Sequence, residues 1–453
     1  MGICTAIVAW LVDIAQATVS DWKLGYCSSN VFLSRENCCR RVGEDGPCDG
    51  EHFTHWSDQY VTKYAIYVAF ALAFGVISSS ATMLTRATLP AVSAEGDAQK
   101  NGNGKAEPAK PTGKKMYMAA GSGIPEIKTI LSGFVIPNFL DLKVLVVKGF
   151  GAVFAVSTGM CLGKEGPFVH ISTCVGYLVA KQISKYRDNG RKMREMLSAA
   201  CASGLSVAFG APIGGVLFSY EEISTYFPRP VMWHAFLCSL SAAMVLKALN
   251  PNGTGKLVLF ETDYGTSYEP IHYLVFVLLG VVGGVFGGIF CKANFMWSKW
   301  FRSYPIIKQN PVLEVFLIVL ATALVQFPNI LIRDPGDTTI KMLLVDCKGA
   351  NAHEQWVCSQ EAGADKGAYI GWLAYGCLAK LILTIITFGI KVPSGVIIPA
   401  LDAGALFGRI VGQVVPGISP GIFAMVGAGA FLGGVSRMTI SLCVIMFEVS
   451  SAR

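Results

Sequence analysis

Three short glycine–proline motifs hold the residue types from which an anion site can be built. They read GSGIPE at 121–126, GKEGP at 163–167 and GVIIP at 395–399. Glycine permits a sharp turn and proline favours the first turn of a helix, so each motif predicts a helix N-terminus. The unpaired N–H groups there stabilise a nearby anion by about 0.3–2 kcal/mol. Several such ends meeting inside a membrane would hold a small anion without trapping it. The simpler interpretation is three unrelated turns between helices.

Two glutamates, one in these motifs and one outside them, could take up and release protons. Glu165 lies among apolar neighbours at a predicted helix start, where an ionisable residue is costly and usually functional. Its carboxylate could occupy the anion position and leave it on protonation, or it could simply favour the helix dipole. Glu222 ends an apolar run and could pass protons onward, or be a polar residue at a membrane boundary. Ser122 adds a hydroxyl donor, whereas the Lys164 side chain is expected to extend outward.

The composition places these motifs in a membrane. Of 453 residues, 53% are apolar and 15% are charged, against about 25% charged in a soluble domain, and the mean hydropathy is +0.50. A chain of this kind cannot hide its apolar surface in water, which excludes a soluble enzyme, a disordered scaffold and a nucleic-acid binder. No nucleophile–base set or metal-ligand spacing stands out in the sequence. We therefore expect no catalytic residue, no metal and no cofactor.

Apolar segments recur along the chain, and several are interrupted or shorter than the roughly 20 residues of a simple spanning helix. Such uneven segments are typical of transporters whose half-helices end inside the membrane. We therefore predict an all-α polytopic membrane protein. The segments are approximately 60–84, 143–162, 167–183, 196–218, 231–249, 271–292, 312–332, 369–390, 395–418 and 420–449. Glycine pairs at the four-residue spacing that favours close helix contact are Gly283 and Gly287, Gly284 and Gly288, and Gly429 and Gly433.

The polar loops predict a topology. Residues 94–115 form a lysine-containing low-complexity insert that should be disordered and, by the positive-inside tendency, cytosolic. The helix before it then places the 21–58 loop on the luminal side, where disulfides can form but their pairing is not readable. Residues 1–20 are either a signal peptide or, as we prefer, part of a first membrane helix, since Asp13 interrupts the run. The cysteines of the polar loops are Cys27, Cys38, Cys39, Cys48, Cys347 and Cys358. Those inside apolar runs, expected to be small buried hydrophobes, are Cys161, Cys174, Cys201, Cys238, Cys291, Cys377 and Cys443.

Taken together, the motifs resemble the CLC family of chloride channels and proton-coupled chloride exchangers. GSGIPE, GKEGP, the block GAPIGGVLFSYEE at 210–222 and GVIIP occur in the family's order, and the match runs from about residue 60 onward. The resemblance is closest to eukaryotic intracellular members, and the 94–115 insert suggests a fungal type. It implies an inverted-repeat helical bundle with discontinuous helices. It also implies a homodimer with one anion pathway in each subunit.

The resemblance assigns roles to single residues. Ser122 corresponds to the serine of the central chloride site, Glu165 to the gating glutamate, and Glu222 to the internal proton glutamate that marks exchangers. Asp402 departs from the family, in which this position is commonly apolar or small. It could tune anion or proton affinity, or be a first-turn acid that the helix dipole stabilises. Backbone groups that would line the chloride sites are those of Lys164, Gly166, Val396, Ile397 and Ile398.

Three hypotheses of function follow. The first is voltage-dependent chloride transport across a vacuolar, endosomal or Golgi membrane, as a proton-coupled antiporter that meets chloride, protons, lipid and a second copy of itself. The second is a passive voltage-gated chloride channel. The third is a truncated subunit that does not transport, because the family's last membrane helices and cytosolic CBS domains would follow Arg453. The expected segments are a partial membrane helix (1–20), a luminal loop (21–58), a membrane helix (59–93), the insert (94–115) and a transport core (116–453).

Overall fold

The computed structural model describes residues 1–40, 52–88, 115–249, 269–347, 356–363 and 366–450, and this part of the chain is almost entirely helical. Two antiparallel hairpins pair β1 (Gly25–Cys27) with β2 (Phe53–His55) and β3 (Arg86–Thr88) with β4 (Lys115–Tyr117). The insert predicted at 94–115 lies outside the described residues except for Lys115, which belongs to β4.

Most of the predicted apolar segments form one helix each. The longer helices are α1 (Gly2–Asp21), α4 (Tyr60–Met83), α6 (Leu142–Ser157), α7 (Glu165–Lys181), α9 (Gly190–Phe209), α11 (Arg229–Leu249), α12 (Pro270–Phe301), α14 (Pro311–Gln326), α18 (Lys366–Thr387), α19 (Ile397–Val414) and α20 (Pro420–Ser436). The shorter ones are α2 (Arg35–Arg40), α5 (Ile124–Leu131), α8 (Ser184–Arg187), α10 (Pro212–Phe218), the π-helical turn η1 (Ser219–Ile223), α13 (Pro305–Gln309), α15 (Ile330–Arg333), α16 (Gly336–Leu344), α17 (Trp356–Ala362) and α21 (Ile440–Ser450).

Two apolar segments each divide into two helices at a residue in the left-handed conformation. Gly210, at φ +69°, separates α9 from α10, and Arg437, at φ +61°, separates α20 from α21. A left-handed residue ends an α-helix because its backbone turns away from the helix axis. Within the described residues, six helices are long and apolar enough to cross a bilayer, namely α1, α4, α11, α12, α18 and α19.

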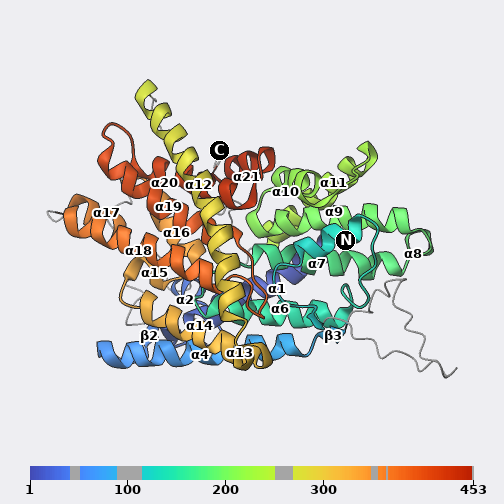
Figure 1. Cartoon of the computed structure of the whole chain (residues 1–453), viewed down its shortest axis with the longest axis horizontal. Coiled ribbons are helices and arrows are strands. Elements are labelled where there is room, and N and C mark those ends of the chain that lie inside the picture. The colour runs from blue at the N-terminus through green and yellow to red at the C-terminus, as the bar shows by residue number, and fades with distance from the viewer. Residues whose placement is uncertain (41–51, 89–114, 250–268, 348–355, 364–365, 451–453) are drawn as a thin grey trace, which may run out of the picture.

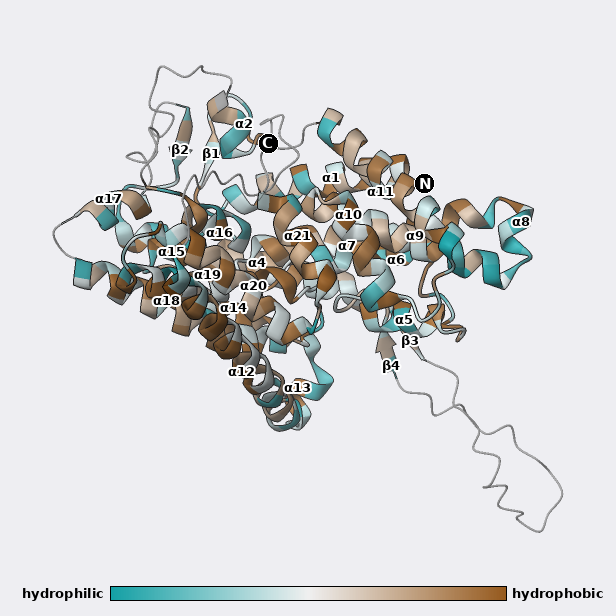
Figure 2. Cartoon of the chain, turned by 90° about the horizontal axis from the view of Figure 1, so that it is seen from above, coloured by the Kyte–Doolittle hydropathy of each residue, from teal (hydrophilic) through white to brown (hydrophobic). Residues whose placement is uncertain are grey.

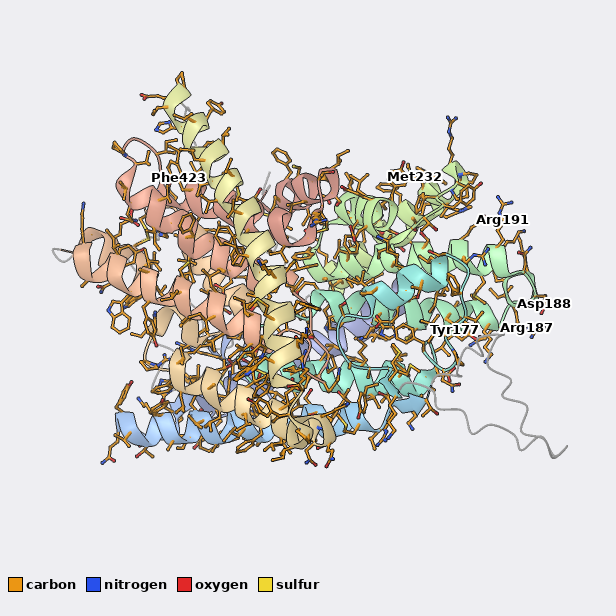
Figure 3. All side chains as sticks on the ribbon, in the orientation of Figure 1. Tyr177, Arg187, Asp188, Arg191, Met232 and Phe423 are labelled. Atoms are coloured by element: carbon orange, nitrogen blue, oxygen red, sulfur yellow. A yellow bond between two sulfur atoms is a disulfide. The ribbon has the colours of Figure 1, made fainter. Side chains whose placement is uncertain are left out.

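The helices form two packed groups. Figure 1 shows α7, α9, α10 and α11 together at one end of the molecule, and α12, α18, α19 and α20 at the other. α1 passes through the interior against α6, α9 and α11, and buries Ala6, Ala9 and Val12. α12 presents a largely apolar surface (Figure 2), which suits contact with lipid. Polar side chains, including Arg187, Asp188 and Arg191, project from the end of the bundle at α8 and α9 (Figure 3).

The loop cysteines form disulfides that the spacing could not assign. Cys27 pairs with Cys38, and Cys347 pairs with Cys358, while Cys48 lies outside the described residues. The cysteines in apolar runs are all free, and most are buried or half-buried as expected. Cys291 and Cys443 are exposed instead, because they lie on the outer faces of α12 and α21.

Only some of the spaced glycine pairs make close helix contacts. A side chain at Gly283 or Gly287 would collide with the backbone of α20, at Ala430 and Gly434 respectively. Gly284 and Gly288 have open space on the same helix. Small residues permit close contact only on the face that meets a partner helix, and the four-residue spacing alone does not identify that face.

This difference predicts contrasting alanine substitutions one residue apart. Gly287→Ala should destabilise the protein by about 1–3 kcal/mol, because its methyl group forces α12 away from the α20 backbone. Gly288→Ala is the matched control and should change stability by less than about 0.5 kcal/mol. Thermal unfolding in detergent measures both. Equal midpoints for the two variants would show that α12 and α20 do not pack as described.

Candidate anion site

The three glycine–proline motifs all begin helices, as predicted. α5 starts at Ile124 behind Gly123, whose φ of +83° favours glycine. α7 starts at Glu165 with Lys164 as its N-cap, and α19 starts at Ile397 with Val396 as its N-cap. Pro125, Pro167 and Pro399 lie in the first turns, where a missing N–H removes no helical hydrogen bond.

Backbone hydrogen bonds hold the three motifs together. Gly163 N–H donates to Gly395 O and Gly395 N–H donates to Gly163 O, both at 2.9 Å, which ties the start of α7 to the start of α19. Gly121 joins the same loop, since its N–H donates to Val392 O at 2.9 Å and its carbonyl accepts from Ser394 N–H at 3.3 Å. Each of these bonds contributes about 0.5–1.5 kcal/mol. Residues more than 270 positions apart in the sequence are therefore neighbours at one point.

Gly166 lies at the meeting point. A Cβ added there would come within 2.8 Å of Ser122 Cβ and 3.2 Å of Gly395 Cα, so only glycine lets the three backbones approach this closely. Ser122 Oγ accepts a hydrogen bond from Ile124 N–H at 3.3 Å, which leaves its hydroxyl hydrogen free to donate. The predicted backbone contributors Gly166, Ile397 and Ile398 are buried beside it.

Glu165 is buried in this centre with one carboxylate oxygen unsatisfied. The residue is 2% exposed, and its Oε2 has no hydrogen-bond partner among the described residues. The carboxylate lies over Gly163, where a side chain would displace it. A buried carboxylate with an unsatisfied oxygen is costly, so the structure holds a group that gains by protonation or by exchange with another anion.

The Lys164 side chain turns away from the centre but is not free in solvent. Its ammonium lies 2.7 Å from Asp13 Oδ1 and donates to Gln16 Oε1 at 3.1 Å, both on α1. The side chain therefore ends at an acid of the first helix rather than in bulk solvent. Asp13 interrupts the apolar run of residues 1–20, and an acid within such a run indicates a functional position.

This ion pair lines a pocket that we call the outer vestibule. The pocket has a volume of about 410 Å³ and opens beside the start of α7. Its walls come from α1 and the residues just after it, α4, the end of α9 and residues 333–341. Charged groups that line it include Asp13, Lys23, Lys164, Arg333, Asp334, Asp337 and Lys341.

Glu222 lies away from the centre, at the other end of α5. It belongs to η1, which packs against α5, and its side chain is 34% exposed. Its Oε1 is 3.7 Å from Lys128 Nζ, a partner that sequence reasoning missed. α5 therefore begins two residues after Ser122 and carries Lys128, the partner of Glu222, in its last turn, so one short helix connects the anion centre with the second glutamate.

Two other acids fasten the helices around η1. Glu221 accepts hydrogen bonds from Thr439 N–H, Thr439 Oγ1–H and Ser441 N–H at the start of α21. Glu448, near the end of α21, accepts from Ile213 N–H at 3.0 Å and Gly214 N–H at 2.6 Å at the start of α10. Each carboxylate thus caps the N-terminus of the other helix. The sequence offered no signal for this pairing because the partners are more than 200 residues apart.

Asp402 does not behave as a first-turn acid. It is the sixth residue of α19, it is buried, and its Oδ2 lies 2.7 Å from Lys380 Nζ on α18. The lysine rather than the helix dipole balances its charge, since dipole stabilisation falls off within the first turn.

Comparison with known proteins agrees with this architecture. The fold and the site define a polytopic helical membrane protein with interrupted helices that meet at a buried glutamate. A family model described as Voltage gated chloride channel matches residues 112–452, and the chain belongs to this family. The resemblance to the CLC family and the predicted fold class are thereby confirmed, and the protein is an integral multi-pass membrane protein.

The chain is similar to a part of several longer relatives. It is 37% identical to H(+)/Cl(-) exchange transporter 3 of Homo sapiens over 497 residues and to H(+)/Cl(-) exchange transporter 5 of Oryctolagus cuniculus over 499. Each alignment covers 99% of this chain but only 57% of the relative's length. A eukaryotic CLC transporter matches with a TM-score of 0.69 at 25% identity, covering 99% of this chain and 66% of that one. A cyanobacterial Cl-/H+ antiporter shares the fold, with a TM-score of 0.66 at 17% identity, covering 99% and 87%.

The reciprocal caps predict coupled effects on stability. Glu221→Gln and Glu448→Gln should each lower stability by about 1–2 kcal/mol, because each removes a carboxylate that caps a helix start. The double variant should lose less stability than the two single variants lose together, since the two acids act on the same pair of helices. Glu222→Gln is the adjacent control and should change stability little. Thermal unfolding in detergent measures these differences. Midpoints equal to that of the wild type for all variants would contradict the contacts of Glu221 and Glu448 with the helix starts.

Proposed function

We propose that this protein exchanges chloride for protons across an internal membrane. The observation that carries the proposal is the buried Glu165 carboxylate, whose Oε2 has no hydrogen-bond partner among the described residues, at the point where α5, α7 and α19 begin. An anion there meets the unpaired N–H groups of the helix starts and the hydroxyl of Ser122, without a full positive charge to retain it. The printed names of the exchange transporters to which the chain is similar support the same activity.

In this mechanism Glu165 competes with chloride for one position. As a carboxylate it occupies the anion position and closes the path. As a neutral acid it leaves this position. One proton is therefore bound by Glu165 when a chloride ion takes the place of its carboxylate. Because a charged group moves within the membrane field, the exchange depends on voltage, at about 2.3 kcal/mol per charge per 100 mV.

Glu222 supplies the second half of proton coupling. It lies at the opposite end of α5 and is partly exposed, so it can exchange protons with water. Lys128 Nζ lies 3.7 Å from its Oε1, so the two side chains meet at this end of α5. A passive channel has no need of a titrating group in this position, which is why we favour exchange over a channel.

The proposal also covers the arrangement of the chain in the membrane. We assign residues 1–20 to a membrane helix, 21–58 to a luminal loop, 59–93 to a segment that contains a second membrane helix, α4, 94–115 to a cytosolic insert and 116–453 to the transport core. The contact of Asp13 with Lys164 supports a membrane helix rather than a signal peptide for residues 1–20, because α1 lines the outer vestibule. We further propose that the protein lies in a vacuolar, endosomal or Golgi membrane and that it forms a homodimer.

Proton-coupled transport is tested with the protein reconstituted in liposomes. A chloride gradient should drive protons uphill in the wild type. Glu222→Gln should abolish proton movement and leave chloride flux, because the second proton site is lost. Glu165→Gln should uncouple the ions and make chloride flux independent of pH, since the amide cannot titrate.

The matched control is Glu195→Gln on the surface of α9, which should keep full coupling. A pH electrode and a chloride electrode record both fluxes in the same sample. Chloride flux in the wild type without proton movement would identify a passive channel and reject the exchanger.

A further inference from the structure

The turn η1, which carries Glu222, has a backbone that is wider than an α-helix. Ser224 N–H donates to Ser219 O at 2.9 Å, five residues back in the chain, and this bond closes the turn. Single π-helical turns are rare in proteins and are frequent at functional sites. The rarity of this backbone form indicates that contacts from outside the turn stabilise it.

One buried serine of α9 contacts both ends of this turn. Ser198 Oγ lies 3.1 Å from Ser219 Oγ at the start of η1 and 2.6 Å from Ser224 Oγ just after its end. Ser219 Oγ–H donates to the carbonyl oxygen of Ser198 at 2.8 Å. Ser198 is 3% exposed and Ser219 is fully buried, so both hydroxyl groups are shielded from bulk water.

The direction of each bond follows from the single hydrogen that a hydroxyl group carries. Ser219 uses its hydrogen on the Ser198 carbonyl, so its Oγ accepts from Ser198 Oγ–H. Ser198 has then used its own hydrogen, so its Oγ accepts from Ser224 Oγ–H. Removal of the Ser198 hydroxyl would therefore take a donor from the start of the turn and an acceptor from its end.

The turn separates two adjacent acids. Glu221 is bound to the start of α21, whereas Glu222 Oε1 lies 3.7 Å from Lys128 Nζ on α5. The side chains of Glu222 and Lys128 are 34% and 48% exposed, and an ion pair so open to water stabilises a position only weakly. The place of the Glu222 carboxylate therefore depends on the backbone of η1.

We propose that Ser198 is a positioning residue for proton transfer at Glu222. Its hydroxyl fixes both ends of η1 to α9, and the turn then directs the Glu222 carboxylate toward Lys128. Ser198 itself takes up no proton. The inference rests on the proposed role of Glu222 in proton coupling, and it adds the residue that keeps this carboxylate in place.

Flux measurements in liposomes test the positioning role. In Ser198→Ala the number of protons moved per chloride should fall by about two-fold or more, because loss of the hydrogen bonds lowers the population of the held turn by at least about that factor. Chloride flux should persist, since the backbone bonds between Gly163 and Gly395 are untouched. The matched control is Ser203→Ala, which removes another buried hydroxyl of α9 and should keep the wild-type ratio. The Ser203 hydroxyl donates to Ala200 O within α9, at 2.8 Å.

A second variant removes the same clasp from the side of the turn. Ser224 is only half-buried, and Ser224→Ala should also lower the proton-to-chloride ratio. The double variant Ser198→Ala/Ser224→Ala should lose less coupling than the two single variants lose together, because both changes remove the same hydrogen bond. Wild-type ratios in both single variants would overturn the positioning role.

A cryo-EM structure of Ser198→Ala separates this inference from the proposed function. The Glu222 carboxylate should leave Lys128 in this variant and remain beside it in Ser203→Ala. A contact that survives in Ser198→Ala would overturn the positioning role, even where the wild type exchanges chloride for protons. If the wild type carries chloride without protons, the proposed function fails, and loss of the contact would still show that Ser198 positions Glu222. Ser224→Ala gives the same comparison where Ser198→Ala does not fold.

Discussion

The reciprocal backbone hydrogen bonds between Gly163 and Gly395 are the constraint on which the rest of the site depends. They fix the start of α7 against the start of α19, and Gly166 then brings Ser122 into contact with both. No side chain takes part in this joint, so backbone amides rather than fixed charges surround the centre. That arrangement lets the titrating group of Glu165 influence the charge at the centre.

Charged residues are placed around this neutral centre rather than in it. Asp13 holds the Lys164 ammonium on the vestibule side, and Lys128 accompanies Glu222 at the far end of α5. Lys380 balances Asp402 within α18 and α19. Each pair keeps a full charge from binding a passing anion tightly, because opposite charges in contact present little net field to a third ion. The bundle can therefore contain many ionisable groups and still leave the helix ends as the main anion-binding elements.

The sequence predicted the helix starts and the buried glutamate because these follow from local chemistry. Proline and glycine spacing locates the starts of α5, α7 and α19, and an acid among apolar residues identifies Glu165. The division of two apolar segments was not predicted, since Arg437 gives no sign of a left-handed conformation. Nor were the partners Asp13 and Lys128, because an ion pair between distant helices depends on packing that local pattern does not specify. Glycine spacing failed similarly, as it marked Gly284 and Gly288, which contact no other helix closely.

The crossed caps of α10 and α21 tie two helices that would otherwise move separately. Glu221 lies next to Glu222 in η1, and its carboxylate is anchored on the start of α21. A tilt of α21 would therefore pull on the turn that carries Glu222 and change its distance from Lys128. Forces applied to the protein at this helix would in this way reach the turn that carries Glu222 without moving the junction of α7 and α19.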